Sequence, residues 1–234
     1  MENTLKQTLY VEFYGLPGCG KSTVSHLLAD RLREEGFKVY EPSYGIDHQK
    51  PLWRKIRKCF LGLYYYIFYH GLYDAIKEIV SKNGYKDTDA FTQTVNIMQK
   101  VAAYRKNSED QIVIWDQGIV QAAISLSLLG KETAKYNLHK LIALLPPSIR
   151  THNVLIDIDE NIALKRMALR SSNDSRVEKV KDENQKSLLL HRFHESICDI
   201  KKEFRGFELH GTLEIKEQTD VIYENIFDNY IKLF

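Results

Sequence analysis

Cysteine is scarce in this sequence: only Cys19, Cys59 and Cys198 occur among its 234 residues. Three widely spaced cysteines exclude the disulfide framework of a small secreted protein and a four-ligand zinc site. The sequence also lacks a basic, apolar leader, and its longest apolar stretch, residues 60–69, has about half of the ~20 residues that a membrane span requires. We therefore expect a cytoplasmic protein that does not associate with a membrane.

An excess of charge of one sign is absent as well. Lys and Arg number 33 against 31 Asp and Glu, so the net charge is +2. A net charge this small creates no field that would attract a nucleic acid polymer. Apolar residues make up 44% and charged residues 27% of the chain, which is the composition of an ordinary globular protein. The length is ample for one domain with a substantial core.

Short apolar segments alternate with helical patterns along the chain. Strands separated by helices predict an α/β fold, in which a five-stranded parallel sheet is covered by helices on both faces. We expect a single domain over residues 1–234 with a helical insertion at about 51–107. The segments expected to form strands are residues 9–14, 37–43, 111–118, 152–160 and 207–215.

A phosphate-binding motif follows the first expected strand. Residues 15–22 read GLPGCGKS and match the pattern G-x-x-x-x-G-K-[ST]. Its glycines let backbone amides surround a phosphate, a helix N-terminus reinforces them, and Lys21 adds a positive charge near the β and γ phosphates. The alternative is a glycine-rich turn in which a serine caps a helix. The residues expected to bind nucleotide are Gly15, Pro17, Gly18, Cys19, Gly20, Lys21, Ser22 and Thr23.

The nucleotide is expected to be ATP, because the Asn-Lys-x-Asp string that reads guanine in signalling GTPases is absent. Phosphoryl transfer from ATP requires Mg²⁺ and a group that orients the acceptor. Ser22 in the loop and Asp116 after a buried strand could bind the metal. A carboxylate with a purely structural role is the alternative for Asp116.

Three further segments, in this order, resemble a known group of kinases. The Glu41-Pro42 pair closes the second expected strand, Asp116 closes the third, and residues 155–176 read as a strand, a helix and a polar loop. With the phosphate loop, they make the chain similar to the thymidylate kinase and deoxynucleoside kinase branch of the nucleotide kinase-like P-loop proteins. The resemblance implies a Glu-Pro pair that faces the acceptor, and a mobile lid at about 166–182.

The chemistry of these residues fits phosphoryl transfer. Glu41 could accept the proton of the acceptor or hold a magnesium-bound water. Arg166 and Arg170 share one helical face, and Arg176 follows a short polar loop, so the three arginines could clamp the transferring phosphate when the lid closes. The structural alternatives are a solvated turn carboxylate for Glu41 and a basic helix end for the arginines.

The resemblance also implies that the insertion forms the acceptor site. Trp53 and the tyrosine-rich residues 61–74 offer aromatic faces for a base or sugar, although such a run is also typical of a core or a dimer contact. Gln93 and Arg105 stand where related kinases contact base and phosphate. Gln117 replaces the arginine that follows the acidic residue in those kinases, and a neutral amide pairs less well with phosphate.

These observations predict a Mg-ATP-dependent phosphotransferase that acts on a small molecule, with a nucleoside monophosphate or a nucleoside as the leading acceptor. Two alternatives stay open. The Gln117 departure allows a non-nucleotide alcohol such as a sugar or an antibiotic, and a non-catalytic, ATP-gated binding module would use the same loop. A homodimer could form through the helices of the insertion.

Overall fold

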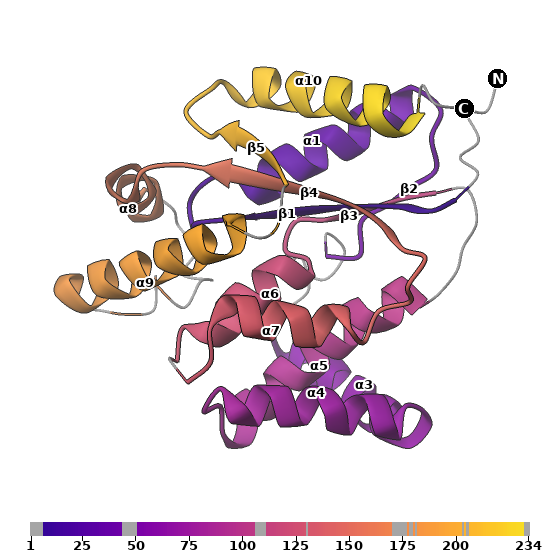
Figure 1. Cartoon of the computed structure of the whole chain (residues 1–234), viewed down its shortest axis with the longest axis vertical. Helices are drawn as coiled ribbons and strands as arrows, with labels where there is room; N and C mark the ends of the chain where they lie inside the picture. Colours follow the sequence, from indigo (N-terminus) through magenta and orange to yellow (C-terminus); the bar gives the residue numbers. More distant parts are fainter. Residues whose placement is uncertain are drawn as a thin grey trace.

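A parallel sheet of five strands forms the centre of the fold (Figure 1). The computed structural model describes residues 7–43, 51–105, 111–129, 131–169, 177, 180, 182–202, 204 and 206–231, without the side chains of residues 51–55. The strand order is β2-β3-β1-β4-β5, and every neighbouring pair is parallel. This confirms the predicted fold class. The strands are β1 (Leu9–Gly15), β2 (Val39–Tyr40), β3 (Ile112–Trp115), β4 (Arg150–Asp157) and β5 (Phe207–His210).

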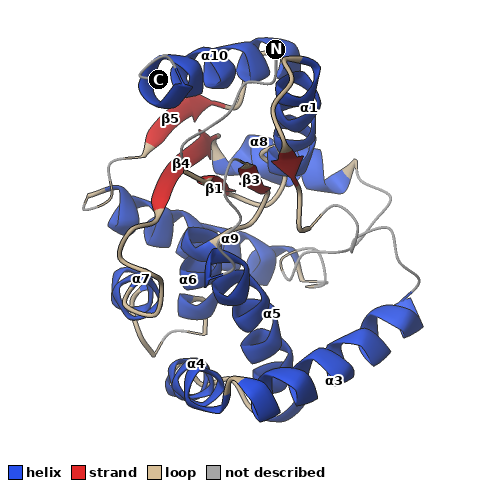
Figure 2. Ribbon diagram, turned by 90° about the vertical axis from the view of Figure 1, so that its right-hand side faces the viewer, coloured by secondary structure: helices blue, strands red, loops and turns tan. Residues whose placement is uncertain are grey.

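Helices cover both faces of this sheet. In Figure 1, α1 and α10 lie on one side of the sheet, and α6, α7 and α9 lie on the other. Helices α3, α4 and α5 follow β2 and extend away from the sheet, as expected for an insertion between the second and third strands (Figure 2). The described helices are α1 (Lys21–Glu34), α3 (Pro51–Phe68), α4 (His70–Lys82), α5 (Asp87–Arg105), α6 (Ile119–Ser127), α7 (Ala134–Ile142), α8 (Glu160–Ala168), α9 (Glu183–Lys201), α10 (Ile215–Ile226) and the π-helical turn η1 (Phe227–Ile231).

Helix starts follow from local sequence. The Asp159 side chain accepts a hydrogen bond from the Asn161 amide at 2.8 Å and so caps α8. Asp182 and Thr133 cap α9 and α7 in the same way. None of the helices in the described ranges is long and apolar enough to cross a membrane.

The second to fifth strands differ in their bounds from the sequence expectation. The second strand has two residues instead of seven, and the fifth ends at His210 because the chain turns at Gly211, whose amide donates to the Asp157 carbonyl. The first strand, in which Leu9, Val11 and Phe13 alternate with polar or amphipathic residues, agrees closely with the expected residues 9–14. It is buried on both faces, because it is central in the sheet and helices lie above and below it.

The C-terminal turn packs over a buried histidine on β4. His152 is 6% exposed, its ring stacks on Phe207, and its Nδ1 atom lies 3.4 Å from the Tyr230 hydroxyl. Its Nε2 atom is buried with no hydrogen-bond partner in the described part of the chain. Burial lowers the pKa of His152 to about 4, because a charged ring would lose its hydration.

Replacing His152 with phenylalanine should flatten the acid dependence of stability. The unfolded chain binds the proton at a pKa near 6.5 and the folded chain only near 4, so the free energy of unfolding falls as the pH drops through this window. Between pH 7 and pH 4, the free energy of unfolding of His152→Phe should fall by up to about 3 kcal/mol less than that of the parent chain. Urea titrations at both pH values measure this loss, and equal losses would argue against a buried neutral imidazole.

Candidate active site at the carboxyl edge of the sheet

The phosphate loop connects the central strand β1 to helix α1. Gly15 and Gly18 have φ angles of 148° and 87°, a region that side chains other than glycine rarely adopt. A Cβ atom at Gly15 would lie 2.5 Å from the Ile156 carbonyl oxygen, and one at Gly18 would lie 2.9 Å from the Ala163 carbonyl oxygen. The loop therefore packs directly against β4 and α8, and only glycine fits at these two positions.

Lys21 points into the loop and is 7% exposed. Its ammonium group donates to the carbonyl oxygens of Gly15 at 2.9 Å and Leu16 at 2.8 Å, and it lies 3.4 Å from the Cys19 sulfur. These contacts hold a positive charge at the concave side of the loop backbone. Pro17 and Gly20 are half-buried, Cys19 is buried, and Thr23 is exposed on the first turn of α1.

Ser22, in the first turn of α1, and Asp116, directly after β3, are brought together at the carboxyl edge of the sheet. The Ser22 hydroxyl donates a hydrogen bond of 3.0 Å to the Asp116 carboxylate. Asp116 follows β3 and is 8% exposed. A hydroxyl and a carboxylate are the hard oxygen ligands that Mg²⁺ prefers, so this pair fits a magnesium ion. The sequence motif and the position after β3 were sufficient to predict that these residues meet.

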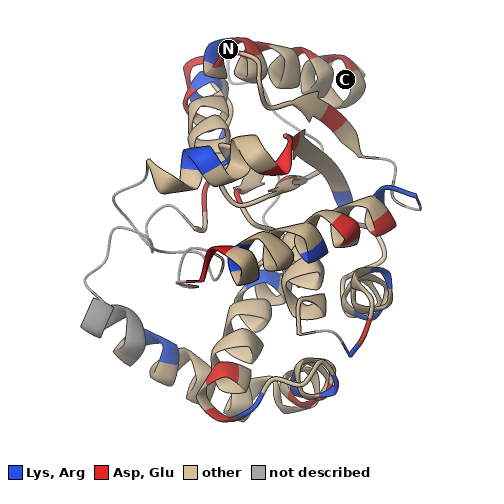
Figure 3. Ribbon diagram, turned by 90° about the vertical axis from the view of Figure 1, so that its left-hand side faces the viewer, with Lys and Arg blue, Asp and Glu red and all other residues tan. Residues whose placement is uncertain are grey.

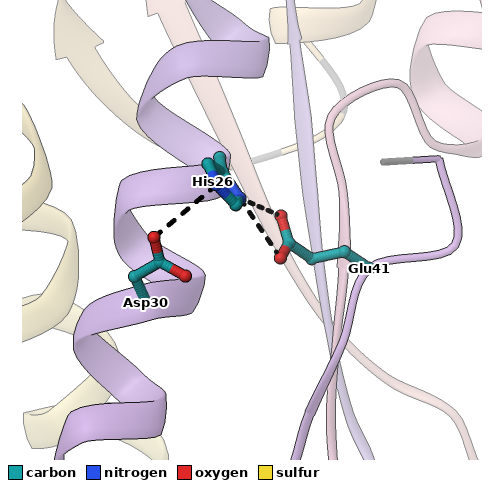
Figure 4. Close-up of side chains that lie close together, drawn as sticks. All are labelled: His26, Asp30 and Glu41. Carbon is teal, nitrogen blue, oxygen red and sulfur yellow. Dashed lines mark hydrogen bonds and ion pairs between the residues drawn. The ribbon is translucent and has the colours of Figure 1, made fainter. Parts of the chain in front are cut away.

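Glu41 lies at the end of β2 in a network of four charged or titratable side chains. Its carboxylate is 9% exposed and accepts hydrogen bonds from His26 at 3.1 Å and Arg33 at 2.6 Å. Asp30 closes the network, with one carboxylate oxygen 2.8 Å from Arg33 and the other 3.6 Å from His26. Figure 4 shows His26 between the carboxylates of Asp30 and Glu41. The three side chains lie close enough together to bind one metal ion. The Arg33 guanidinium already bonds both carboxylates, so the protein supplies the compensating positive charge itself.

A second carboxylate, Glu12, is buried behind this edge. It is 2% exposed, accepts a hydrogen bond of 3.1 Å from the Val120 amide and contacts the Tyr104 hydroxyl. A Cβ atom at Gly118 would lie 2.1 Å from the Glu12 carboxyl carbon, so the start of α6 needs glycine there. Burial raises the pKa of Glu12, and the amides of Ile119 and Val120 partly oppose this rise.

Helix α6 also touches the phosphate loop itself. The Gln121 side-chain oxygen accepts a hydrogen bond of 3.0 Å from the Gly15 amide, and Gln121 is 5% exposed. Sequence reasoning missed Glu12, Gln121, His26 and Arg33. A single charged residue inside an apolar strand was a usable signal for Glu12, but nothing in the sequence points to the partners of the other three.

The expected lid is only partly described. Arg166, half-buried on α8, donates to the Gly211 carbonyl at 2.9 Å, at the turn after β5. Helix α8 contacts the phosphate loop at Gly18, so Arg166 lies on one of the helices that pack against the loop. Arg170 and Arg176 lie outside the described residues, as does the side chain of Trp53 on α3.

The three remaining expected acceptor residues lie in different places. Gln117 is exposed directly after Asp116. Gln93, half-buried, lies about 10 Å along α5 from Lys100, whose ammonium is over the ring of Trp115 at the end of β3. Arg105 donates to the Leu144 carbonyl at 2.9 Å. Two residues earlier on α5, the Ala103 carbonyl accepts a hydrogen bond from the hydroxyl of Tyr10, which is near the start of β1. Arg105 is therefore at the amino edge of the sheet, about 17 Å along β1 from the loop, and does not belong to this site.

No protein-family model and no curated protein sequence matches this chain. Solved structures do match it. Deoxyadenosine kinase from M. mycoides with dCMP and dCDP bound has a TM-score of 0.52 at 14% sequence identity, over 94% of this chain and 98% of that chain. With bound dATP, the same kinase has a TM-score of 0.53 at 14% identity, over 93% and 98%. Shikimate kinase from Acinetobacter baumannii in complex with shikimate has a TM-score of 0.55 at 15% identity, over 97% and 96%.

This chain has the fold of the P-loop kinases. The likeness extends over nearly the whole chain, including the helices between β2 and β3 and the segment around α8. In this P-loop kinase fold, the loop after β1, Glu41 after β2 and Asp116 after β3 all lie at the carboxyl edge of one sheet, where ligands bind in open α/β sheets.

The support that Glu12 gives to α6 can be measured by comparing two substitutions. Glu12→Leu would leave the Val120 amide and the Tyr104 hydroxyl buried without a partner, at a cost of about 1–3 kcal/mol for each group. Glu12→Gln keeps an oxygen that can accept from the Val120 amide, and its amino group can donate to the oxygen of the Tyr104 hydroxyl. We expect the leucine variant to be at least ~2 kcal/mol less stable than the glutamine variant in urea unfolding at pH 7.

The same pair of variants tests the ionisation of Glu12. Because its folded-state pKa is raised, the parent chain should lose stability relative to Glu12→Gln as the pH rises above 4.5. Equal stability of the leucine and glutamine variants at every pH would show that Glu12 does not support α6.

Proposed function

We propose that this protein is a Mg-ATP-dependent kinase that phosphorylates a small-molecule acceptor, with a nucleoside or a nucleoside monophosphate as the leading class. The observation that carries this proposal is the hydrogen bond between Ser22 and Asp116 beside the buried ammonium of Lys21. A phosphate loop, a cation and a magnesium-binding oxygen pair are the parts that phosphoryl transfer needs on the donor side. The P-loop kinase fold supports the same reaction.

On the donor side, the backbone amides of Gly18, Gly20, Lys21 and Ser22, together with the Lys21 ammonium, bind the phosphates of ATP. In this structure the Lys21 ammonium bonds the carbonyls of Gly15 and Leu16 and the sulfur of Cys19. ATP binding must therefore move it away from these carbonyls toward the β and γ phosphates. Ser22 and Asp116 would hold Mg²⁺, which would supply positive charge next to the phosphates. The Gln121 bond to the Gly15 amide fixes where the loop begins.

On the acceptor side, Glu41 orients the attacking hydroxyl and receives its proton. A carboxylate offers about four acceptor sites, so the contacts to His26 and Arg33 leave room for a substrate hydroxyl. Arg166, Arg170 and Arg176 on a lid at about 166–182 supply positive charge when the lid closes over the transferring phosphate. We also propose that the chain is one kinase domain, with the insertion at about 51–107 as its acceptor-binding part through Trp53 and Gln93.

A second acceptor class has support of its own. Gln117 is exposed and neutral next to Asp116, so this position offers no cation for an acceptor that already carries phosphate. The shikimate kinase that shares this fold is bound to shikimate, which is not a nucleotide. A non-nucleotide alcohol, such as a sugar or an antibiotic, is therefore the second candidate.

The reaction is tested by ADP formation from Mg-ATP across a panel of acceptors. The panel contains nucleosides, nucleoside monophosphates, sugars, cyclic hydroxy acids and aminoglycosides, and Lys21→Met serves as the control because it keeps most of the aliphatic stem. We expect one class to stimulate turnover, and the Lys21 variant to lose at least ~100-fold of it while its melting temperature stays close to that of the parent. No stimulation by any class, or full turnover in the folded variant, would contradict the proposal, and tight ATP binding without turnover would favour an ATP-gated binding module.

Asp116→Asn should lower turnover far more than stability, because the amide keeps the shape but loses the charge that binds Mg²⁺. We expect a loss of ~100-fold or more at saturating ATP, and a shift of the magnesium requirement to higher concentration. Asp74→Asn is the matched control, because Asp74 is an exposed carboxylate on α4 away from the loop. A variant that unfolds, or one with the parental magnesium dependence, would assign Asp116 a structural role instead.

A further inference from the structure

Glu41 is buried although the strand before it is exposed. Strand β2 lies at the edge of the sheet, and its two residues, Val39 and Tyr40, pair with β3 on one side. Tyr40 is 53% exposed, whereas the side chain of the next residue, Glu41, is 9% exposed. Pro42 follows and has no amide hydrogen to donate. The pairing of β2 therefore does not by itself fix the direction of the Glu41 carboxylate.

Both carboxylate oxygens of Glu41 are bonded from helix α1. The Nδ1 atom of His26 lies 3.1 Å from one oxygen and 3.4 Å from the other, and Arg33 donates to the second oxygen at 2.6 Å. The carboxylate of Asp30 lies 2.8 Å from Arg33 and 3.6 Å from the Nε2 atom of His26. Figure 4 shows that His26 and Asp30 approach from the same helix. Two donors on one helix thus hold the Glu41 carboxylate, and Asp30 orients both of them.

These partners lie on the face of α1 that begins at the phosphate loop. Ser22, His26 and Asp30 follow one another at steps of four residues, and Arg33 comes three residues later, so the four share one helical face. His26 is therefore about 6 Å along the helix axis from Ser22, which fits Mg²⁺. Apart from the lysine of the loop, the charged residues of α1 lie in its C-terminal half, where acidic and basic residues are mixed (Figure 3). One helix thus carries a residue of the donor site and the side chains that hold Glu41.

We propose that His26 and Arg33 are the positioning residues of Glu41, which hold its carboxylate so that the remaining lone pairs face the hydroxyl of the acceptor. This role rests on the proposed function, in which Glu41 receives the proton of that hydroxyl. Phosphoryl transfer requires the attacking oxygen to be in line with the transferring phosphate, and a misplacement of about 1 Å can cost about 100-fold in rate. Helix α1 sets this distance, because it begins at the phosphates and ends beside Glu41.

A bridge that only joins α1 to β2 would use the same contacts, but its loss would lower stability without changing the reaction. Positioning instead predicts a loss of kcat with little change in the KM for ATP, because the phosphate loop and Lys21 stay intact. It also predicts that the loss acts through Glu41, so that removing a positioning residue matters little once Glu41 itself has been changed.

Steady-state kinetics with the acceptor class that stimulates ADP formation test this role. His26→Ala removes the Nδ1 donor and should lower kcat at least ~10-fold, with the KM for ATP within about 2-fold of the parent value. His26→Asn places an amide donor close to the position of Nδ1, so it should recover most of the lost kcat. His191→Ala is the matched control, because the Nδ1 atom of His191 also lies 3.1 Å from a glutamate oxygen, that of Glu160 between α8 and α9. It should leave kcat unchanged.

A double-mutant cycle shows whether His26 acts through Glu41. In a Glu41→Gln background, adding His26→Ala should lower kcat by less than about 2-fold. Losses that multiply in the double variant, or a parental kcat in folded His26→Ala, would overturn the positioning role and leave the kinase proposal intact.

Arg33→Lys gives a second test that does not depend on the folding of His26→Ala. Lysine keeps the charge but lacks the planar fork that bonds Asp30 and Glu41 together, so kcat should fall about 5-fold or more. A folded Arg33→Lys variant with the parental kcat would overturn the positioning role as well. Absence of stimulation by every acceptor in the parent chain would instead overturn the proposed function, and this role with it.

Discussion

The hydrogen bond between Ser22 and Asp116 joins the first turn of α1, at the end of the phosphate loop, to the residue that follows β3, and the arrangement of the site depends on it. Strands β1 and β3 are parallel neighbours, with Glu12 paired to Trp115, so the segments that follow both strands leave the sheet at the same edge. Because β1 is central, the loop that follows it is flanked by β3 on one side and by β4 on the other. The loop, the carboxylate and the start of α1 are thereby fixed relative to one another without any ligand.

Hydrogen bonds between β1 and helix α6 support the carboxyl edge of the sheet. Glu12 and Gln121 both bind the start of α6 to β1, one through the Val120 amide and the other through the Gly15 amide. Burying a carboxylate in an apolar layer is costly unless its oxygens are paired, and here a tyrosine and backbone amides pair them. The insertion differs, since its outer helix exposes apolar side chains while its inner face is packed. The contacts that support the site thus lie near the loop, and the exposed apolar side chains lie on the outer helix of the insertion.

The sequence predicts the fold to the extent that local patterns determine it. The phosphate loop, the position of Asp116 and the cap at Asp159 depend on residues within one strand-to-helix connection, and all three are recognisable in the sequence. Five apolar segments were enough to predict five parallel strands. The length of β2 was not predictable in this way, because a two-residue strand at the sheet edge pairs with only one neighbour and has little apolar pattern of its own.

Contacts between distant segments explain what the sequence could not predict. Gln121 meets Gly15 across 106 residues, and Arg105 lies at the amino edge of the sheet because of the direction in which α5 runs past Tyr10. The network of His26, Arg33 and Glu41 depends on how β2 sits beside α1. Motifs identify which residue types are present, whereas the packing of helices on the sheet decides which of them face one another.

Calorimetric titration of ATP into the protein, with Mg²⁺ and with a chelator in its place, tests the central claim most directly. A magnesium-ATP site at the phosphate loop predicts that ATP binds and that its affinity rises with Mg²⁺, since Ser22 and Asp116 would share the ion with the phosphates. Absence of ATP binding, or an affinity that does not respond to Mg²⁺, would contradict it.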